Sequence, residues 1–387
     1  MPRRLLQTFV QISDLHFGDI DAQGSVSYDC CMKTLWTAFP FFGGLVGHDP
    51  KALRHLMYFY RNPRKCDPSA KLLLTGDLTS SAKKSQFDRC VDYIVGLLPP
   101  PLDDLGLNTG PWLKEAMGDE HADSHQAIPG NHDHWPGRWR WFWLLGGPGA
   151  ILQQWQPRFP FVGPPIPLSG TDVRLRFLSL NSDAAVWPWG PERILARGNF
   201  QNQLRELASA LSPVVGDPNE IRVLLLHHSL VYEAKDDDRY QAKSYLGKRW
   251  YALTSRLGQL EMNHASRRDL RTLLARCDIP VVLTGHTHSP LVRKYHTLSL
   301  ERRRPVGYLE ARCGTTTQVN EVPSKWPSVV RNRRLDENTL LVHQLYEVEG
   351  PKIVWQTHTL QRDPERGFER VAKRGEPWDS EIVVWPR

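Results

Sequence analysis

The stretch IPVVLTGHTHSP, residues 279–290, joins a short apolar run to a pair of histidines. Residues 279–284 are nearly all apolar, which is typical of a strand buried on both faces. His286 and His288 follow at once behind a glycine. A His-x-His pair alone could equally be a polar turn, so its meaning depends on how the other predicted strands end.

Three other short runs have the same apolar form: TFVQIS (8–13), KLLLT (71–75) and IRVLLL (221–226). Three amphipathic helices are predicted between the runs, with the apolar stripes Phe87, Val91, Ile94 and Leu98; Leu204, Leu207 and Leu211; and Leu270, Leu273, Leu274 and Cys277. We expect Ser266 to cap the third helix and the prolines 99–101 to end the first. Strands that alternate with helices predict an α/β core.

The character of the sequence shifts toward strands after residue 305. GYLEARCGTTTQV (307–319) is rich in strand formers, and TLLVHQLYEVEG (339–350) followed by PKIVWQTHTL (351–360) is typical of a hairpin. A half-exposed strand is expected over residues 173–181, where apolar and polar residues alternate. We expect these later strands to build a second sheet that packs on the first.

A single domain is expected over residues 1–362. Three segments in it resemble insertions, near 19–68, 135–160 and 230–265, and residues 363–387 are expected to be a polar tail without assigned structure. The Trp- and Arg-rich start of the second segment could line a substrate site, touch lipid or pack on the core. The third could be a lid or a solvated surface.

The composition, 40% hydrophobic and 24% charged residues among 387, is ordinary for a soluble globular protein. No run of 18 apolar residues occurs, and the apolar part of MPRRLLQTFVQ is too short for a signal peptide. The six cysteines show no paired spacing, which suits reduced thiols and a cytoplasmic protein. A net charge of +7 mildly favours anionic partners such as phosphates, nucleic acid or acidic lipid.

Polar side chains follow all of the apolar runs, as they do at residues 284–290. In chain order they are Asp14 and His16; Asp77; Asn131, His132 and Asp133 in the block GNHD; His227 and His228; and His286 and His288. Each block alone has a simpler explanation as a turn, a helix cap or a core histidine. Because neighbouring strands end at one edge of a sheet, we expect the five blocks to converge at a common site.

The predicted site offers carboxylate, amide and imidazole donors and no thiolate, which suits divalent Mn, Fe or Zn. Seven donors exceed the needs of one tetrahedral ion but fit two ions if one carboxylate bridges them. Two ions roughly 3.5–4 Å apart are the usual clamp for in-line displacement at phosphorus, because they polarise phosphoryl oxygens and activate water. Gly76, Gly130 and Gly285 would let the backbone turn sharply beside these donors.

The order of the five blocks resembles the signature of the calcineurin-like metallophosphoesterase superfamily: D-x-H, G-D, G-N-H-[D/E], H and G-H-x-H. The resemblance runs from Asp14 to His288 and implies a four-layer αββα sandwich of two mixed β-sheets. It also implies two metal ions. Their ligands would be Asp14, His16 and His288 for one ion, Asn131, His227 and His286 for the other, and Asp77 for both.

The resemblance further implies that His132 is catalytic, placed to stabilise the phosphoryl group or to protonate the leaving oxygen. Asp133 would orient His132, and His228 would contact the substrate. Two positions depart from the family pattern. Ser80 stands three residues after the bridging aspartate, where Asp or Asn is common, and HHSL (227–230) replaces the HHPP of the cyclic-nucleotide phosphodiesterase branch.

These expectations predict a dinuclear metal-dependent hydrolase of phosphate esters, with a phosphodiesterase of nucleotides or other small phosphodiesters first. A nuclease, favoured by the basic balance, a lipid-linked pyrophosphatase and a protein phosphatase stay open on the same metal site. A non-catalytic scaffold is disfavoured because every ligand position is filled. A mononuclear binding module would leave several donors unused. No protein partner is predicted.

Overall fold

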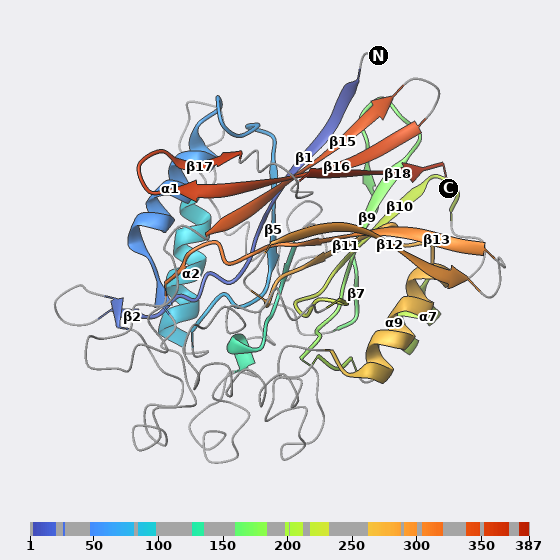
Figure 1. Cartoon of the computed structure of the whole chain (residues 1–387), viewed down its shortest axis with the longest axis horizontal. Helices are drawn as coiled ribbons and strands as arrows, with labels where there is room; N and C mark the ends of the chain where they lie inside the picture. Colours follow the sequence, from blue (N-terminus) through green and yellow to red (C-terminus); the bar gives the residue numbers. More distant parts are fainter. Residues whose placement is uncertain are drawn as a thin grey trace, which may run out of the picture.

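Two seven-stranded β-sheets lie face to face between two pairs of helices in the computed structural model (Figure 1). The structure describes residues 3–20, 26–27, 47–80, 84–97, 126–134, 159–183, 198–200, 202–211, 217–231, 262–287, 290–299, 304–319, 338–348, 352–370 and 379–386.

The first sheet joins the N-terminal strand to strands from the C-terminal end of the chain. Its order is β17 (Gly367–Arg370), β16 (Lys352–Asp363), β15 (Thr339–Val348), β1 (Arg4–Ile12), β5 (Lys71–Thr75) and β6 (Gln126–Ile128), with β18 (Asp379–Trp385) also paired to β16. β1 runs parallel to β5 and antiparallel to β15, so the sheet is mixed.

The second sheet contains the strand that precedes the His-x-His pair. Its order is β12 (Leu291–Ser299), β13 (Arg304–Arg312), β11 (Val281–Thr284), β10 (Glu220–Leu225), β9 (Arg174–Ser179) and β7 (Phe161–Val162), with β8 (Ile166–Pro167) paired to β9. Two small ribbons pair β2 (Asp19–Ile20) with β3 (Val26–Ser27), and β4 (Gly47–His48) with β14 (Gln318–Val319).

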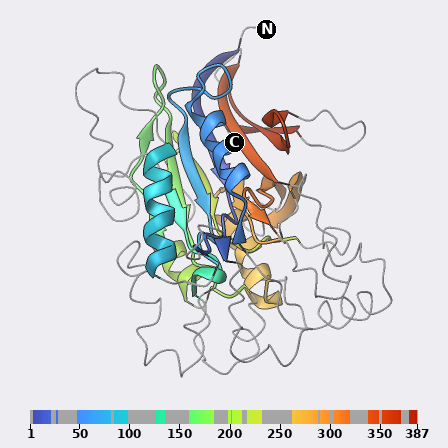
Figure 2. The same cartoon turned by 90° about the vertical axis from the view of Figure 1, so that its left-hand side faces the viewer.

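Alternating apolar side chains explain why the sheets stack. In β1, Val10 packs in the cluster under the helices α1 (Pro50–Arg61) and α2 (Lys84–Leu97), whereas Phe9 packs between the two sheets. In β10, Val223 faces the first sheet and Leu224 faces α7 (Gln203–Ala210) and α9 (His264–Arg276). Figure 2 shows α1 and α2 on the near side of the sheets and α9 on the far side. The four-layer sandwich expected from the resemblance is therefore confirmed.

The expected division of strands between the sheets was wrong. The N-terminal runs 8–13 and 71–75 lie in one sheet, and 221–226 and 279–284 in the other. The later hairpin β15–β16 does not build a separate sheet, because β15 pairs with β1 over most of its length. The first sheet thus combines β1, β5 and β6 with the late strands β15 to β18, whereas the second is built from the intervening strands β7 to β13.

Two local expectations also need correction. Asn263, not Ser266, caps α9, since its side chain accepts a hydrogen bond from the amide of Ala265 at 2.9 Å. The polar tail 363–387 is not without structure, because it contains β17 and β18, which extend the first sheet beside β16. The apolar run of β18, residues 382–385, is short and follows a polar stretch.

Of the three predicted insertions, only parts can be compared with the structure. The first contains α1, which buries Leu56 and Phe59 against the first sheet. Residues 135–158 and 232–261, in the other two, lie outside the described residues.

The described residues bear on two further expectations, the absence of a membrane-spanning helix and the reduced state of the cysteines. No helix in it is both long and apolar enough to cross a membrane. The free thiols of Cys66, Cys90, Cys277 and Cys313 are buried, as expected for reduced cysteines.

Candidate metal centre

The predicted ligands gather where the strands of both sheets end. Asp14 and His16 follow β1, Asp77 follows β5, and Asn131 follows β6, all from the first sheet. His227 and His286 follow β10 and β11 of the second sheet. All six are at most 5% exposed. His288 lies outside the described residues.

The loop after β1 lies against the loop after β5 and continues their pairing. The amides of Asp14 and His16 donate to the carbonyl oxygens of Gly76 and Asp77, each at 3.0 Å. Asp14, His16 and Asp77 have φ angles of 54°, 50° and 53°, a left-handed conformation that side-chain-bearing residues rarely adopt. Such conformations persist where surrounding structure enforces them, and they concentrate at functional sites.

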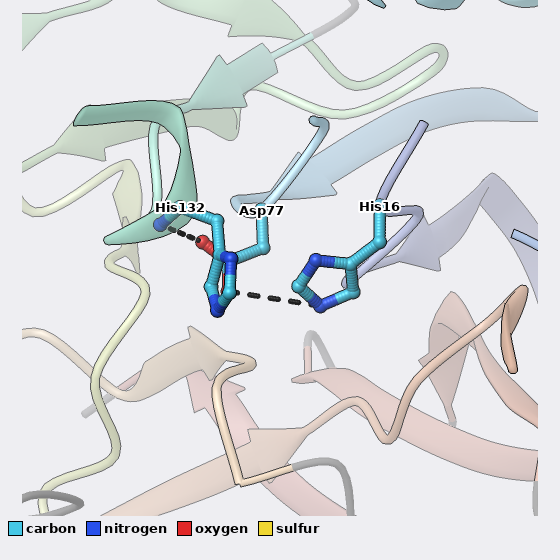
Figure 3. A group of neighbouring side chains, drawn as sticks. All are labelled: His16, Asp77 and His132. Carbon is cyan, nitrogen blue, oxygen red and sulfur yellow. Dashed lines mark hydrogen bonds and ion pairs between the residues drawn. The ribbon is translucent and has the colours of Figure 1, made fainter. Parts of the chain in front are cut away.

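Asp77 stands at the centre of the site. Its Oδ2 lies 3.8 Å from His16 Nε2 and 3.3 Å from His227 Nε2, while Oδ1 accepts a hydrogen bond from the His132 amide at 2.8 Å. Figure 3 shows the His16 and His132 rings reaching toward this carboxylate from different loops. Burial raises the pKa of Asp77, but the imidazoles of His227 and His132 outweigh it and hold the pKa well below its usual range.

An amide oxygen and two imidazole nitrogens form a close triangle next to Asp77. Asn131 Oδ1 lies 3.2 Å from His227 Nε2 and 3.0 Å from His286 Nδ1, and the two nitrogens are 3.3 Å apart. His227 Nδ1 donates to the Thr75 carbonyl at 2.7 Å, so in the neutral ring Nε2 carries a lone pair. That lone pair faces Asn131 Oδ1 and Asp77 Oδ2, which are also acceptors.

Facing acceptors repel one another unless a cation lies between them. Burial lowers the pKa of His227, but the Asp77 carboxylate outweighs it and raises the pKa to about 9, so a proton can serve as that cation. A metal ion fits too, because bonds of about 2.1 Å place neighbouring ligand atoms about 3.0–3.4 Å apart. Asp77 Oδ2 is buried without a hydrogen-bond partner in the described structure, as expected for a ligand atom. The donors therefore fit a divalent ion.

Asp14 and His16 form a second group on the other side of Asp77. Asp14 Oδ2 accepts from Ser13 Oγ at 2.5 Å and from the His286 amide at 3.2 Å, while Oδ1 lies 3.7 Å from His16 Nε2. Burial is the largest cause that lowers the pKa of His16 to about 4. A neutral imidazole beside two carboxylates is the protonation state that a metal ligand requires.

Possible ligand atoms of His16, Asp77 and His132 lie within 4.8 Å of one another, and so do those of Asp77, His227 and His286. Asp77 is thus common to two candidate metal groups. The sequence model of the family described as calcineurin-like phosphoesterase matches residues 7–290, more than half of the chain. The chain belongs to the calcineurin-like phosphoesterase family. A search of curated proteins finds no match.

Membership makes this chain a phosphoric ester hydrolase of a family that acts on phosphorylated substrates with divalent metal ions. The matched region contains every predicted ligand and the strands that present them. The two sheets with helices on their outer faces agree with this family assignment.

His132 occupies the first turn of η1 (His132–His134) of the phosphoesterase and is only partly buried. Its Nδ1 donates to the Ser80 carbonyl at 2.9 Å, and its ring meets the His16 ring edge-on with centroids 4.7 Å apart. A carbonyl can only accept, so Nδ1 keeps its proton in the neutral ring and exchange takes place at Nε2.

The expectation that Asp133 orients His132 was wrong. The Asp133 carboxylate instead accepts hydrogen bonds from the amides of Leu78, Thr79 and Gly130 at 2.9–3.1 Å. These amides point into the turn and need an acceptor there, which the carboxylate supplies. Burial and the charge of Asp77 raise the pKa of Asp133 to about 7. Asp133 therefore joins the loops of Asp77 and Asn131, and Ser80 is the residue that orients His132.

His228, the predicted substrate contact of the phosphoesterase, is fully buried. Its Nδ1 lies 2.8 Å from Ser182 Oγ, and its ring packs on His286 with centroids 4.2 Å apart. His228 is thus as buried as the neighbouring His227 and packs on the His286 ring, and its contact with substrate stays a prediction.

The glycines of the phosphoesterase motifs allow a close approach as well as a turn. A Cβ on Gly76 would lie 2.4 Å from His227 Nδ1, and one on Gly130 would lie 2.1 Å from Asp77 Oδ1. A Cβ on Gly285 would lie 2.0 Å from Ser13 Oγ. Gly76 also has a φ of +96°, which favours glycine for conformational reasons.

Sequence reasoning overlooked the contacts that orient the predicted residues of this phosphoesterase. Ser13 and Thr75 bond to Asp14 and His227, but each looks like an ordinary residue near the end of a strand. Thr79 Oγ1 donates to Asp133 at 2.9 Å. The only available signal was that these residues adjoin the motifs.

Proposed function

We propose that this phosphoesterase is a dinuclear metal-dependent phosphodiesterase that acts on a nucleotide or another small phosphodiester. The observation that carries the proposal is the position of Asp77, whose Oδ2 lies 3.8 Å from His16 Nε2 and 3.3 Å from His227 Nε2. One carboxylate between two groups of ligand atoms is the arrangement that two neighbouring ions require.

The proposed ligands divide into two sets that share Asp77. They are Asp14, His16 and His288 for one ion, Asn131, His227 and His286 for the other, and Asp77 for both. Mn, Fe and Zn are the metals that suit oxygen and imidazole donors. The contacts around Asp77 and Asn131 support this division. We further propose one domain over residues 1–362, extended by β17 and β18, with insertions near 19–68, 135–160 and 230–265.

Two bound divalent ions would polarise the phosphoryl oxygens and lower the pKa of a water molecule. We assign His132 the proton transfer to the leaving oxygen through Nε2. The bond from Nδ1 to the Ser80 carbonyl fixes the orientation of the ring, and it would stabilise the imidazolium before the proton leaves. Asp133 keeps the Asp77 loop next to His132 and makes no contact with substrate in this scheme.

The experiment that tests this proposal compares bis(p-nitrophenyl) phosphate with p-nitrophenyl phosphate. The protein is stripped with chelator, then restored with Mn²⁺, and Asp77→Ala is assayed beside it. We expect Mn²⁺-dependent turnover that Asp77→Ala abolishes, with the diester preferred. Asp278→Ala is a matched control, because Asp278 has the same left-handed φ of 53° but lies at the opposite end of β11 from His286.

Each result leads to a different conclusion. A preference for the monoester would overturn the diesterase assignment and keep the metal site. Cleavage of a DNA oligonucleotide that weakens steeply with salt would favour a nuclease, the alternative supported by the net charge of +7. Absence of both metal binding and turnover in the wild-type protein would support a scaffold instead.

A further inference from the structure

The loop that carries Asp14 and His16 is held from two sides. On one side its amides donate to the loop after β5, as described above. On the other side its carbonyl oxygens face a run of three threonines, residues 315–317, which follows β13. All three threonines are at most 3% exposed. They lie beyond residue 290, where the match to the family model ends.

Each threonine bonds to a different part of the loop. Thr315 Oγ1 donates to the Asp14 carbonyl at 3.0 Å, and Thr317 Oγ1 donates to the Leu15 carbonyl at 2.7 Å. Thr316 pairs with Ser13, giving its own amide to the Ser13 carbonyl at 2.9 Å and accepting from the Ser13 amide through Oγ1 at 3.1 Å. The three threonines thus bond to consecutive residues of the loop, Ser13, Asp14 and Leu15.

These bonds bear on metal binding because the loop is in an unfavourable conformation. Asp14 and His16 both have positive φ angles, 54° and 50°, and neither is a glycine. Without the hydroxyl groups, the buried carbonyls of Asp14 and Leu15 would lose hydrogen bonds, and the peptide groups would be able to rotate. Rotation there would move the Asp14 carboxylate and the His16 ring relative to Asp77.

We propose that Thr315 and Thr317 are positioning residues that hold Asp14 and His16 in the geometry of one metal site. The inference rests on the proposed dinuclear centre. It deepens that function by assigning part of the site to residues after the last family motif. The threonines touch neither the ions nor the substrate. Their hydroxyl groups donate to the loop of Asp14 and His16, which are proposed ligands of one of the two ions, so we expect them to act mainly on that ion.

The test measures Mn²⁺ binding to the metal-stripped protein by isothermal titration calorimetry. Thr315→Val and Thr317→Val keep the branched shape and remove the hydroxyl. Residues that orient metal ligands typically change metal affinity about 10–100-fold, so we expect a loss of this size at one Mn²⁺ site and no change at the other. Thr315→Ser and Thr317→Ser, which restore the hydroxyl, should return the affinity toward the wild-type value.

Thr339→Val is the matched control. Thr339 is 1% exposed and neighbours Thr315, but its Oγ1 has no hydrogen-bond partner within the described structure. This variant should bind both ions with wild-type affinity. Thermal unfolding of each metal-free variant is measured in parallel, and if a Val variant does not fold, Thr317→Ala is compared with Thr317→Ser.

Lower thermal stability with unchanged Mn²⁺ affinity in the Thr315 and Thr317 variants would overturn the positioning role. Equal weakening of both ions would also overturn it, since Asp14 and His16 are proposed ligands of one ion. A wild-type protein that binds no Mn²⁺ would overturn this inference and the proposed function together. A wild-type protein that binds two ions while the variants match it would overturn the inference alone.

Discussion

The two halves of the metal centre differ in how tightly their ligand atoms already lie together. In the imidazole half, formed by Asn131, His227 and His286, the distances between ligand atoms are 3.0–3.3 Å. In the carboxylate half, formed by Asp14 and His16 with Asp77, they are 3.7–3.8 Å. The imidazole half is already close to the spacing that a bound ion imposes, whereas the carboxylate half must contract.

Protonation separates the two halves further. The pKa of His227 is raised to about 9, while the pKa of His16 is lowered to about 4. At neutral pH an ion must displace a proton from His227, but no proton from His16. Burial, with a contribution from His132, outweighs the neighbouring carboxylates at His16, whereas the Asp77 carboxylate outweighs burial at His227. The imidazole half is thus preorganised but carries a proton on His227. In the carboxylate half His16 is neutral, but the ligand atoms lie farther apart.

Removing one ligand from each half is the strongest way to test this comparison. We expect Asp14→Asn and His227→Asn each to lose one ion and to retain the other through the opposite half. Turnover should fall roughly 10³-fold in both, because the in-line clamp needs both ions. Metal content by mass spectrometry, measured beside turnover, checks the prediction. Two ions retained in either variant would contradict the division of ligands.

His132 sharpens the comparison, because it touches the carboxylate half without being a proposed ligand there. We expect His132→Gln to lower kcat about 10²-fold, within the usual range for a general acid, while two ions stay bound. Loss of an ion together with activity would show that His132 is a ligand rather than an acid.

Gly130 and Gly285 allow a smaller and more local perturbation. A Cβ on Gly130 would meet Asp77 itself, at 2.1 Å from Oδ1 and 2.4 Å from the amide nitrogen. A Cβ on Gly285 would meet first the Ser13 hydroxyl, at 2.0 Å. We expect Gly130→Ala to cost about 10²-fold in kcat and to weaken both ions, since small displacements of this kind are costly. Gly285→Ala should cost less and weaken mainly the carboxylate half, as metal titrations can measure.

Much of this centre could be predicted because its signals are local. Short apolar runs ending in Asp, Asn or His show both the strands and the edge where they end, and Asp14, Asp77, His227 and His286 do meet there. The alternation that separates Phe9 from Val10 also identifies the two buried faces of a strand. Local patterns of this kind depend on neighbours within a few residues.

Features that depend on distant partners could not be predicted. Nothing in β15 reveals that Val342 pairs with Val10 in the first sheet. Asp133 was assigned to the adjacent His132, whereas its carboxylate satisfies amides of the loop after β5. Thr315 and Thr317 had only the appearance of strand formers, because the carbonyls they bond to are about three hundred residues away in sequence. A hydrogen bond to a backbone group far away in the chain leaves no pattern in the sequence around the donor.

The smallest expected effect is on the pH dependence of stability, and it concerns His343, a buried histidine of β15. Gln11 of β1 donates to the Thr284 carbonyl of β11 at 2.8 Å, and His343 Nε2 donates to Gln11 Oε1 at 2.9 Å. His343 Nδ1 accepts from Thr357 Oγ1 at 2.9 Å. Gln11, which bonds to His343 within the first sheet, therefore joins that sheet to β11 of the second sheet through the Thr284 carbonyl.

Burial, with a smaller contribution from His358, lowers the pKa of His343 to about 3 in the folded protein. In the unfolded chain the pKa is about 6.5, so as pH falls below that value only the unfolded state binds the proton. Stability is therefore lost as pH falls from about 6.5 toward 3, at up to about 1.4 kcal/mol per pH unit, and is unaffected above pH 7.

We expect His343→Gln to remove this contribution, making the free energy of unfolding less dependent on pH between about 6 and 4 by nearly one proton. Urea unfolding of the metal-free protein at a series of pH values measures it. His48 also has a pKa lowered to about 4, chiefly by burial, so His48→Gln shows what a buried histidine outside the sheet-to-sheet bonds contributes. If wild-type and His343→Gln proteins lost stability in parallel, His343 would bind its proton equally in the folded and unfolded states, and this prediction would be wrong.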